Sequence, residues 1–309
     1  MSNLVDYIKY FWCGHIVNWP WRSRLKRRNI RNIAFTSMKI DYLKKYIPFI
    51  ESLKPQSNIP SDLDYKEEKV FTIWLQGMDK APEVVKKCVY SIKEKFGDRF
   101  EVLDENTLFD YINLDPSIIE KWKNGMILPA HFSDIARLEL LYRYGGYWFD
   151  ATDFLTGNVP KEIENSNFFI YITSENLLIH TFVQNYFIRA KKGDPLLKMW
   201  RDLVMHYWKH ENKAASYYLV QHLFRLLVRY NEEAKKLYEK MPKIELDCTQ
   251  VIWHKVGNDP YDGAVFEQMC KDSFFQKCTY RKKTGIIRDI IPGSMADYLL
   301  NSLHYKNHM

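Results

Sequence analysis

Apolar residues recur along the chain with two spacings, and together these predict an α/β fold. A continuous apolar run at residues 70–75 predicts a buried strand, because a parallel strand covered on both faces is apolar throughout, and residues 100–103 and 168–172 predict two further strands. Between them, apolar positions three or four apart predict helices that start after Pro82, Asp115 and Asp194. Alternating strands and helices favour a Rossmann-like, mostly parallel sheet flanked by helices.

The most informative stretch is residues 130–153. It predicts a helix with Asp134 and Arg137 on one side, a stop at Gly145-Gly146, and a short bulky strand that ends at Asp150. In open α/β sheets, ligands bind beyond the carboxyl ends of the strands. Alone, each part has an ordinary interpretation, such as a surface ion pair or a turn residue. In this order they predict a crevice for a metal-bound diphosphate, and hence a sugar-nucleotide enzyme.

Positive charge is concentrated at the start of the chain. Of the formal net charge of +7, +6 falls within residues 1–31, where one acid, Asp6, faces seven basic residues: Lys9, Arg22, Arg24, Lys26, Arg27, Arg28 and Arg31. Interfacial aromatic residues, including Trp19 and Trp21, accompany them. This mixture favours an anionic membrane surface over nucleic acid, which we do not expect as a partner. A solvated arm is the plain alternative. Residues 33–53 predict a helix interrupted at Pro48.

Composition suggests a cellular setting. A chain of 309 residues that is 46% hydrophobic can bury one large core. Its five cysteines form no C-x-x-C pair, which favours a reduced compartment. We see no signal peptide and no apolar run of the roughly 20 residues that a spanning helix needs. We therefore expect a cytoplasmic protein peripherally associated with the inner face of the plasma membrane, with a basic helical extension at 1–60 and a catalytic domain at 61–309.

The central stretch resembles a known family. Ser133-Asp134-x-x-Arg137, followed by Tyr144-Gly-Gly-x-x-x-Asp150, resembles the bacterial capsular polysaccharide synthesis proteins, which are related to the family 32 glycosyltransferases. The resemblance covers most of residues 68–245, including Ile73-Trp-Leu-Gln-Gly77 and Asn185-x-Phe-Ile. It implies a GT-A fold and transfer of a hexose, with retention of configuration, from a nucleotide sugar such as a UDP-sugar. The implied acceptor is a growing surface glycan or its polyprenyl-linked precursor.

The resemblance also implies residue roles. Asp134 and Arg137 match the pair that grips the donor sugar and its phosphate side, and Asp150 matches the first acid of the D-x-D motif. We take these three as the candidate catalytic residues. Thr152 stands where the family 32 motif has its second acid, and the next carboxylate is Asp153. Asp150 and Asp153 are therefore the candidate ligands of Mn²⁺ or Mg²⁺, and Thr152 a donor contact.

Five further residues are candidate donor contacts. Trp74 would stack on the base, Gln76 would hydrogen-bond it, and Gly77 would admit a close backbone approach. His131 would touch phosphate, and Lys277 would neutralise the leaving diphosphate. The plain alternatives are core packing for Trp74, helix capping or packing for His131 and an ordinary surface position for Lys277.

Two other functions stay open at this point. A sugar-phosphate transferase would use similar charged groups but would move the phosphate together with its sugar. A non-enzymatic, membrane-bound assembly factor with a decayed site is favoured by Thr152 at the second acid position.

Overall fold

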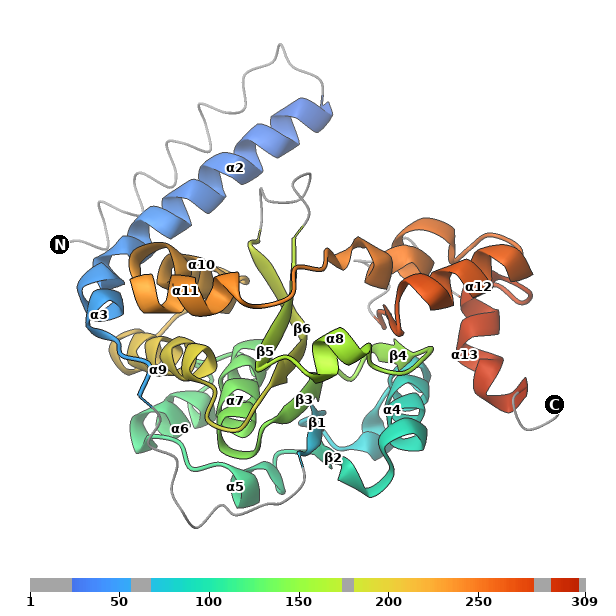
Figure 1. Ribbon diagram of the computed structural model, residues 1–309, viewed down its shortest axis with the longest axis horizontal. Helices are drawn as coiled ribbons and strands as arrows, with labels where there is room; N and C mark the ends of the chain where they lie inside the picture. The colour runs from blue at the N-terminus through green and yellow to red at the C-terminus, as the bar shows by residue number, and fades with distance from the viewer. Residues whose placement is uncertain (1–23, 57–67, 174–180, 281–289, 306–309) are drawn as a thin grey trace.

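A five-stranded sheet lies at the centre of the molecule, with helices around it (Figure 1). The computed structural model describes residues 24–56, 68–173, 181–280 and 290–305. In spatial order the strands are β2 (Phe100–Leu103), β1 (Val70–Ile73), β3 (Gly146–Phe149), β6 (Val183–Ala190) and β5 (Phe168–Ile172). β1 pairs in parallel with β2 and β3, whereas β6 runs antiparallel to β3 and β5. Four of the five strands therefore share one direction, which confirms the predicted mixed α/β fold with a mostly parallel sheet.

Helices surround this sheet, and three of them begin where the sequence predicted. The α-helices are α2 (Arg24–Leu43), α3 (Ile47–Ser52), α4 (Glu83–Phe96), α5 (Leu108–Tyr111), α6 (Pro116–Lys123), α7 (Pro129–Tyr144), α8 (Lys161–Glu164), α9 (Pro195–His210), α10 (Leu219–Tyr230), α11 (Glu232–Glu239), α12 (Gly263–Asp272) and α13 (Met295–Tyr305). Pro82 immediately precedes α4, while the side chains of Asp115 and Asp194 accept backbone N–H bonds at the starts of α6 and α9. These local signals are therefore sufficient to place three helix starts.

A small second sheet was not predicted. β4 (Asp153–Leu155) pairs antiparallel with β7 (Phe275–Lys277), so a segment near the end of the chain lies beside the turn that follows β3. The register sets Asp153 opposite Lys277. The reversed strand β6 was likewise not predicted, because an apolar run carries no information about its direction.

The N-terminal extension shares the core of the rest of the molecule. Leu43, Tyr46 and Ile50 are buried in the same apolar cluster as the sheet, and the Asn231 amide donates to the carbonyls of Ile50 and Leu53 at 2.8 and 3.0 Å. Figure 1 shows α3 beside α10 and α11. The division predicted at residue 60 therefore does not coincide with a gap in packing between the extension and the sheet.

Part of the predicted arm lies outside the described residues, namely 1–23. The predicted helix at 33–53 forms as α2 and α3, separated by a short 3₁₀ turn at Lys44–Tyr46, and Pro48 lies in the first turn of α3. Among the helices that the structure describes, none combines the length and apolar character needed to cross a bilayer.

Two glycines, Gly145 and Gly146, connect the end of α7 to β3. Gly145 and Gly146 have φ angles of +69° and +95°, a region that L side chains rarely adopt. A Cβ on Gly146 would lie 1.8 Å from the carbonyl oxygen of Lys69, at the start of β1. Glycine therefore allows β3 to pass directly against the neighbouring strand and to aim Asp150 beyond the sheet.

Candidate active site

Asp134, Arg137 and Asp150 come together at the carboxyl end of β3. One terminal nitrogen of Arg137 lies 3.3 Å from an oxygen of Asp134, and the other lies 3.3 Å from an oxygen of Asp150. The Arg137 guanidinium also lies over the ring of Trp148, 4.6 Å from its centroid, and the Trp148 indole N–H donates to Asp150 at 2.9 Å. The three candidate catalytic residues thus form one contiguous group, although two of them come from a helix and the third follows a strand.

Lys277 completes this group from the second sheet. Its Nζ lies 2.8 Å from Asp150 Oδ2 and 3.2 Å from Asp153 Oδ1. The Asp153 side chain is fully buried, and its other oxygen accepts the backbone N–H of Asp150 at 3.0 Å. The alternative of an ordinary surface lysine is therefore wrong: Lys277 lies within the charged group.

These contacts shift the pKa values of the group. Burial alone would raise the pKa of Asp150, but the charges of Lys277 and Arg137 outweigh it and hold the pKa below its ordinary value. Burial raises the pKa of Asp153 to about 8; Lys277 opposes the shift and Asp150 adds to it. Burial alone would lower the pKa of Lys277, but Asp150 and Asp153 raise it above its ordinary value. At neutral pH, Asp150 is therefore ionised and Lys277 carries a proton.

The carboxylates expected to hold a metal ion already have partners. Asp150 faces Arg137, Trp148 and Lys277, and Asp153 faces Lys277 and a backbone N–H. Within the part of the chain that the structure describes, no three His, Cys, Asp or Glu side chains gather so that they could hold a metal ion. These residues alone do not fit a divalent cation, which needs several oxygen ligands at 2.0–2.6 Å. Binding of Mn²⁺ or Mg²⁺ stays a prediction.

Two amide side chains that sequence analysis did not select support Asp134. The Asn185 amide donates to Asp134 Oδ1 at 2.8 Å, and the Gln221 amide donates to Asn185 Oδ1 at the same distance. Arg137 also donates to the Asn185 carbonyl. The available signal was a polar residue inside the apolar run of β6, but it does not reveal which carboxylate the amide meets. The chain of amides fixes the orientation of Asp134.

His131 lies beside Asp134, on the side of α9 and α10. Its Nδ1 is 3.6 Å from Asp134 Oδ2, and its ring centroid lies 5.8 Å from Trp208 and 6.3 Å from Tyr217. The ring is buried, and its Nδ1 has no hydrogen-bond partner among the described residues. A bound ligand could satisfy this atom, whereas helix capping does not account for it. Contact with phosphate stays a prediction.

The turn after β1 reaches the end of β7. The ring of Trp74 meets that of Tyr280 edge-on at 5.3 Å, and its indole N–H is buried without a hydrogen-bond partner among the described residues. Gly77 has a φ of +79°, and Gln76 is exposed. No described hydrogen bond or ion pair joins these three residues to the charged group. The carbonyl of Thr152, just before β4, accepts the N–H of Cys278, just after β7, at 2.7 Å, so this bond extends the pairing of the second sheet.

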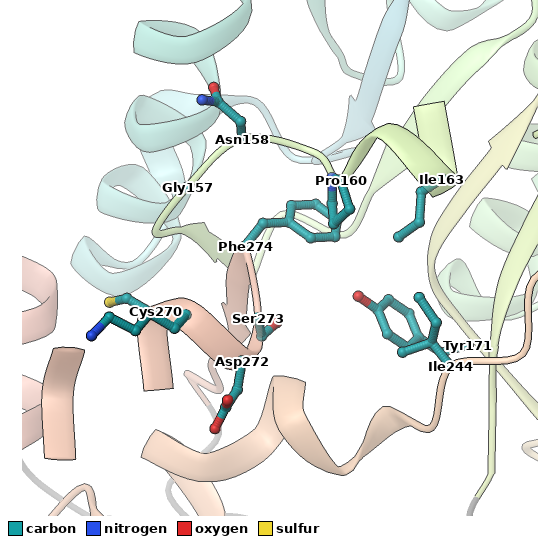
Figure 2. Close-up of a pocket in the computed structure, with 11 residues that line it drawn as sticks. Gly157, Asn158, Pro160, Ile163, Tyr171, Ile244, Cys270, Asp272, Ser273 and Phe274 are labelled. Carbon is teal, nitrogen blue, oxygen red and sulfur yellow. The ribbon is translucent and has the colours of Figure 1, made fainter. Parts of the chain in front are cut away.

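A cavity elsewhere in the molecule is a separate feature. It has a volume of about 160 Å³ and is lined by residues that include Pro160, Ile163, Tyr171 and Phe274 (Figure 2). None of the predicted site residues lines it. The charged group at the end of β3, and not this cavity, is therefore the candidate active site.

The sequence of the chain matches a known protein family. The capsular polysaccharide synthesis protein family matches residues 8–298, nearly the whole chain. The chain belongs to this family. The match confirms the resemblance noted from the motif at residues 133–150 and extends it in both directions, across the N-terminal extension and α12.

Curated relatives of this family member carry glycosyltransferase names. The O-glycosyltransferase braB of Annulohypoxylon truncatum is 24% identical over 177 residues, which are 51% of this chain and 42% of that protein. The glycosyltransferase afumC of Aspergillus fumigatus (strain CBS 144.89 / FGSC A1163 / CEA10) is 24% identical over 188 residues, 52% of this chain and 46% of that protein. The matched regions span less than half the length of these relatives.

A solved structure gives a weaker likeness. The PaToxG glycosyltransferase is 16% identical, with a TM-score of 0.36, and the alignment covers 68% of this chain and 85% of that one. At this TM-score the likeness does not establish a common fold.

Proposed function

We propose that this chain is a glycosyltransferase that moves a hexose from a nucleotide sugar, such as a UDP-sugar, to a growing capsular or other surface glycan or its lipid-linked precursor. The observation that carries the proposal is the contiguous group formed by Asp134, Arg137, Asp150 and Lys277. Membership of the capsular family and the names of its curated relatives support it. A GT-A-type arrangement and retention of configuration enter the proposal through the family resemblance.

The proposed step uses two cations around one carboxylate. An acceptor hydroxyl oxygen bonds to the anomeric carbon, the bond from that carbon to the diphosphate breaks, and its electron pair leaves with the nucleotide. The hydroxyl proton passes to an oxygen of the departing phosphate. Arg137 and Lys277 offset the negative charge that develops there, while Asp150 holds both cations in place. Asp134, oriented by Asn185, would accept hydrogen bonds from the sugar.

Residues around this group would bind the rest of the donor. The unpartnered indole N–H of Trp74 and the exposed Gln76 suit the base, and Gly77 leaves room for it. The unpartnered Nδ1 of His131 is available to a phosphate or a sugar hydroxyl, and Thr152 lies beside Asp153. Asp150 and Asp153 remain the predicted ligands if Mn²⁺ or Mg²⁺ takes part, an alternative to Lys277 that is tested below.

The donor assignment is tested by thermal unfolding with a panel of nucleotide sugars, with and without Mn²⁺. We expect one nucleotide sugar to stabilise the protein selectively, by about 2.7 kcal/mol at a hundred times its Kd. The nucleoside alone serves as the control and should stabilise it much less. Mass spectrometry of the product then separates the alternatives. A transferred phosphodiester would favour the sugar-phosphate transferase, and no shift and no product with any donor would favour the assembly factor.

We further propose that the basic arm holds the protein at the inner face of the plasma membrane. Replacing Arg22, Arg24, Lys26, Arg27 and Arg28 by Gln should weaken binding to anionic liposomes by at least about 100-fold, because each cation near such a surface contributes about 1 kcal/mol. Co-sedimentation with liposomes measures this effect.

A matched control variant has the same net charge as the arm variant but keeps the arm intact. Five exposed lysines elsewhere, Lys86, Lys95, Lys123, Lys235 and Lys240, are replaced by Gln. Equal loss of liposome binding in both variants would show that total charge, and not the arm, governs attachment. Unchanged binding in the arm variant would contradict the membrane assignment.

A further inference from the structure

The position of Lys277 bears on the predicted metal ion. Its ammonium lies between the two carboxylates proposed as metal ligands, 2.8 Å from Asp150 and 3.2 Å from Asp153. These carboxylates belong to one turn, in which the N–H of Asp153 donates to the carbonyl of Asp150 at 2.9 Å. A divalent ion shared by both carboxylates would have to lie where the ammonium now lies. The two cations would then repel each other at close range.

Most oxygens of both carboxylates already accept a hydrogen bond. Asp150 Oδ1 accepts the Trp148 indole N–H and faces Arg137, and its Oδ2 accepts from Lys277. One oxygen of Asp153 faces Lys277, and the other accepts the N–H of Asp150. Three of the four oxygens thus accept a hydrogen bond, and the fourth, Asp153 Oδ1, lies 3.2 Å from the Lys277 ammonium without a hydrogen bond among the described residues. A metal ion shared by both carboxylates would have to displace the Lys277 ammonium that lies between them.

The fold holds Lys277 in this place. β7 pairs with β4 so that Lys277 is directly opposite Asp153, and the N–H of the next residue, Cys278, donates to the carbonyl of Thr152. The Lys277 ammonium also lies 5.2 Å from the centroid of the Tyr186 ring. Its side chain is 17% exposed, so it is packed and not free to swing into solvent. The position is therefore set by backbone pairing and not by the ion pair alone.

We infer that the ammonium of Lys277 takes the place of a divalent cation in this chain, and that transfer proceeds without Mn²⁺ or Mg²⁺. The inference rests on the proposed donor site, and it assigns to Lys277 the fixed positive charge that meets the departing diphosphate. Thr152 at the second acid position agrees with it, since a site that holds an ammonium has no need of another carboxylate. In the proposed transfer step, Arg137 and Lys277 are then the two cations that stabilise the electron pair leaving with the nucleotide.

Binding of Mn²⁺ itself provides a test that does not depend on activity. Electron paramagnetic resonance of free Mn²⁺ is followed as the full-length protein is added. We expect no binding at the site by the wild type, and a new site in Lys277→Met, where both carboxylates lose the ammonium. Lys271→Met, an exposed lysine on α12, is the matched control and should bind no more Mn²⁺ than the wild type. Stoichiometric binding by the wild type that disappears in Asp153→Asn would overturn the inference.

Transfer assays supply the second readout. Wild-type activity should change by no more than about twofold when EDTA is added, since no metal charge is lost. Lys277→Met should lose most activity and Lys277→Arg should retain more of it, with unfolding midpoints measured for both to confirm that they fold. Abolition of wild-type transfer by EDTA, restored by Mn²⁺, would overturn the inference while leaving the glycosyltransferase assignment intact. Failure of every donor to bind would instead remove the proposed function, and the Mn²⁺ titration would still decide which cation the carboxylates hold.

Discussion

Asp150→Asn should lower the rate of transfer by about 100- to 1000-fold, the usual cost of removing one preorganised charged or polar group from a catalytic site. The amide keeps the shape of the side chain but removes the charge that holds both Arg137 and Lys277. Either cation could then move away from the position that suits the diphosphate. The measurement is the initial rate of sugar transfer, together with donor affinity from the thermal panel.

The control for this prediction is another aspartate that bridges two cations. Asp202 on α9 lies 2.7 Å from both Lys198 and Arg201, and its side chain is 23% exposed, against 28% for Asp150. Asp202→Asn should leave the transfer rate unchanged. Equal losses in the two variants would mean that the effect reflects general destabilisation, and full activity in Asp150→Asn would refute the assignment of the site.

The stability of Asp150→Asn should depend on pH in a definite direction. Because the folded protein depresses the pKa of Asp150, ionisation of this carboxyl favours the folded state above the pKa of an unfolded aspartate. The advantage of the wild type over Asp150→Asn should therefore be complete at neutral pH. It should shrink as the pH falls below about 4, where the carboxyl becomes protonated in the unfolded and then in the folded chain.

Gly146→Ala should be the most damaging small substitution for folding. The new Cβ would lie 1.8 Å from the Lys69 carbonyl oxygen, a backbone atom that immediately precedes β1 and cannot move aside as a flexible side chain could. Strain at a φ of +95° adds to this overlap, so we expect a loss of about 3 kcal/mol or more, or no soluble protein. Urea unfolding followed by circular dichroism measures the loss.

Gly125→Ala separates the two causes. Gly125 has a φ of +70°, but no atom lies within 4 Å of the position that its Cβ would occupy. This variant carries the backbone strain without the overlap, and it should cost only about 1 kcal/mol. Equal costs in the two variants would show that the close approach of β3 to β1 is not what requires glycine at position 146.

Local signals in the sequence were enough to predict the part of the site that comes from one continuous segment, namely Asp134, Arg137 and Asp150. The helix α7, its glycine stop and the strand β3 follow one another, so spacing alone placed Asp134 and Arg137 on one side and Asp150 beyond the strand. The same holds for the proline and aspartate starts of α4, α6 and α9, since a cap acts within a single turn.

The remainder of the site depends on pairings between distant segments. Lys277 reaches Asp150 because β7 pairs with β4, and Asn185 reaches Asp134 because β6 reverses direction beside β3. A three-residue strand such as β7 has too few positions to show a period. Gln221 lies among the apolar residues of α10, and its bond to Asn185 becomes visible only when α10 and β6 are placed together. The family resemblance included Asn185 without assigning it a role, and it did not include Gln221.

The helix α10 links the N-terminal extension to the candidate active site. Asn231, which follows its last turn, donates to the carbonyls of Ile50 and Leu53 in the extension, while Gln221, in its first turn, starts the amide chain that ends at Asp134. The extension and the candidate site are therefore joined through one helix by a series of hydrogen bonds. Under the proposed membrane attachment, lengthening or shortening the extension would change the distance between the candidate site and the lipid surface, and with it which acceptors come within range.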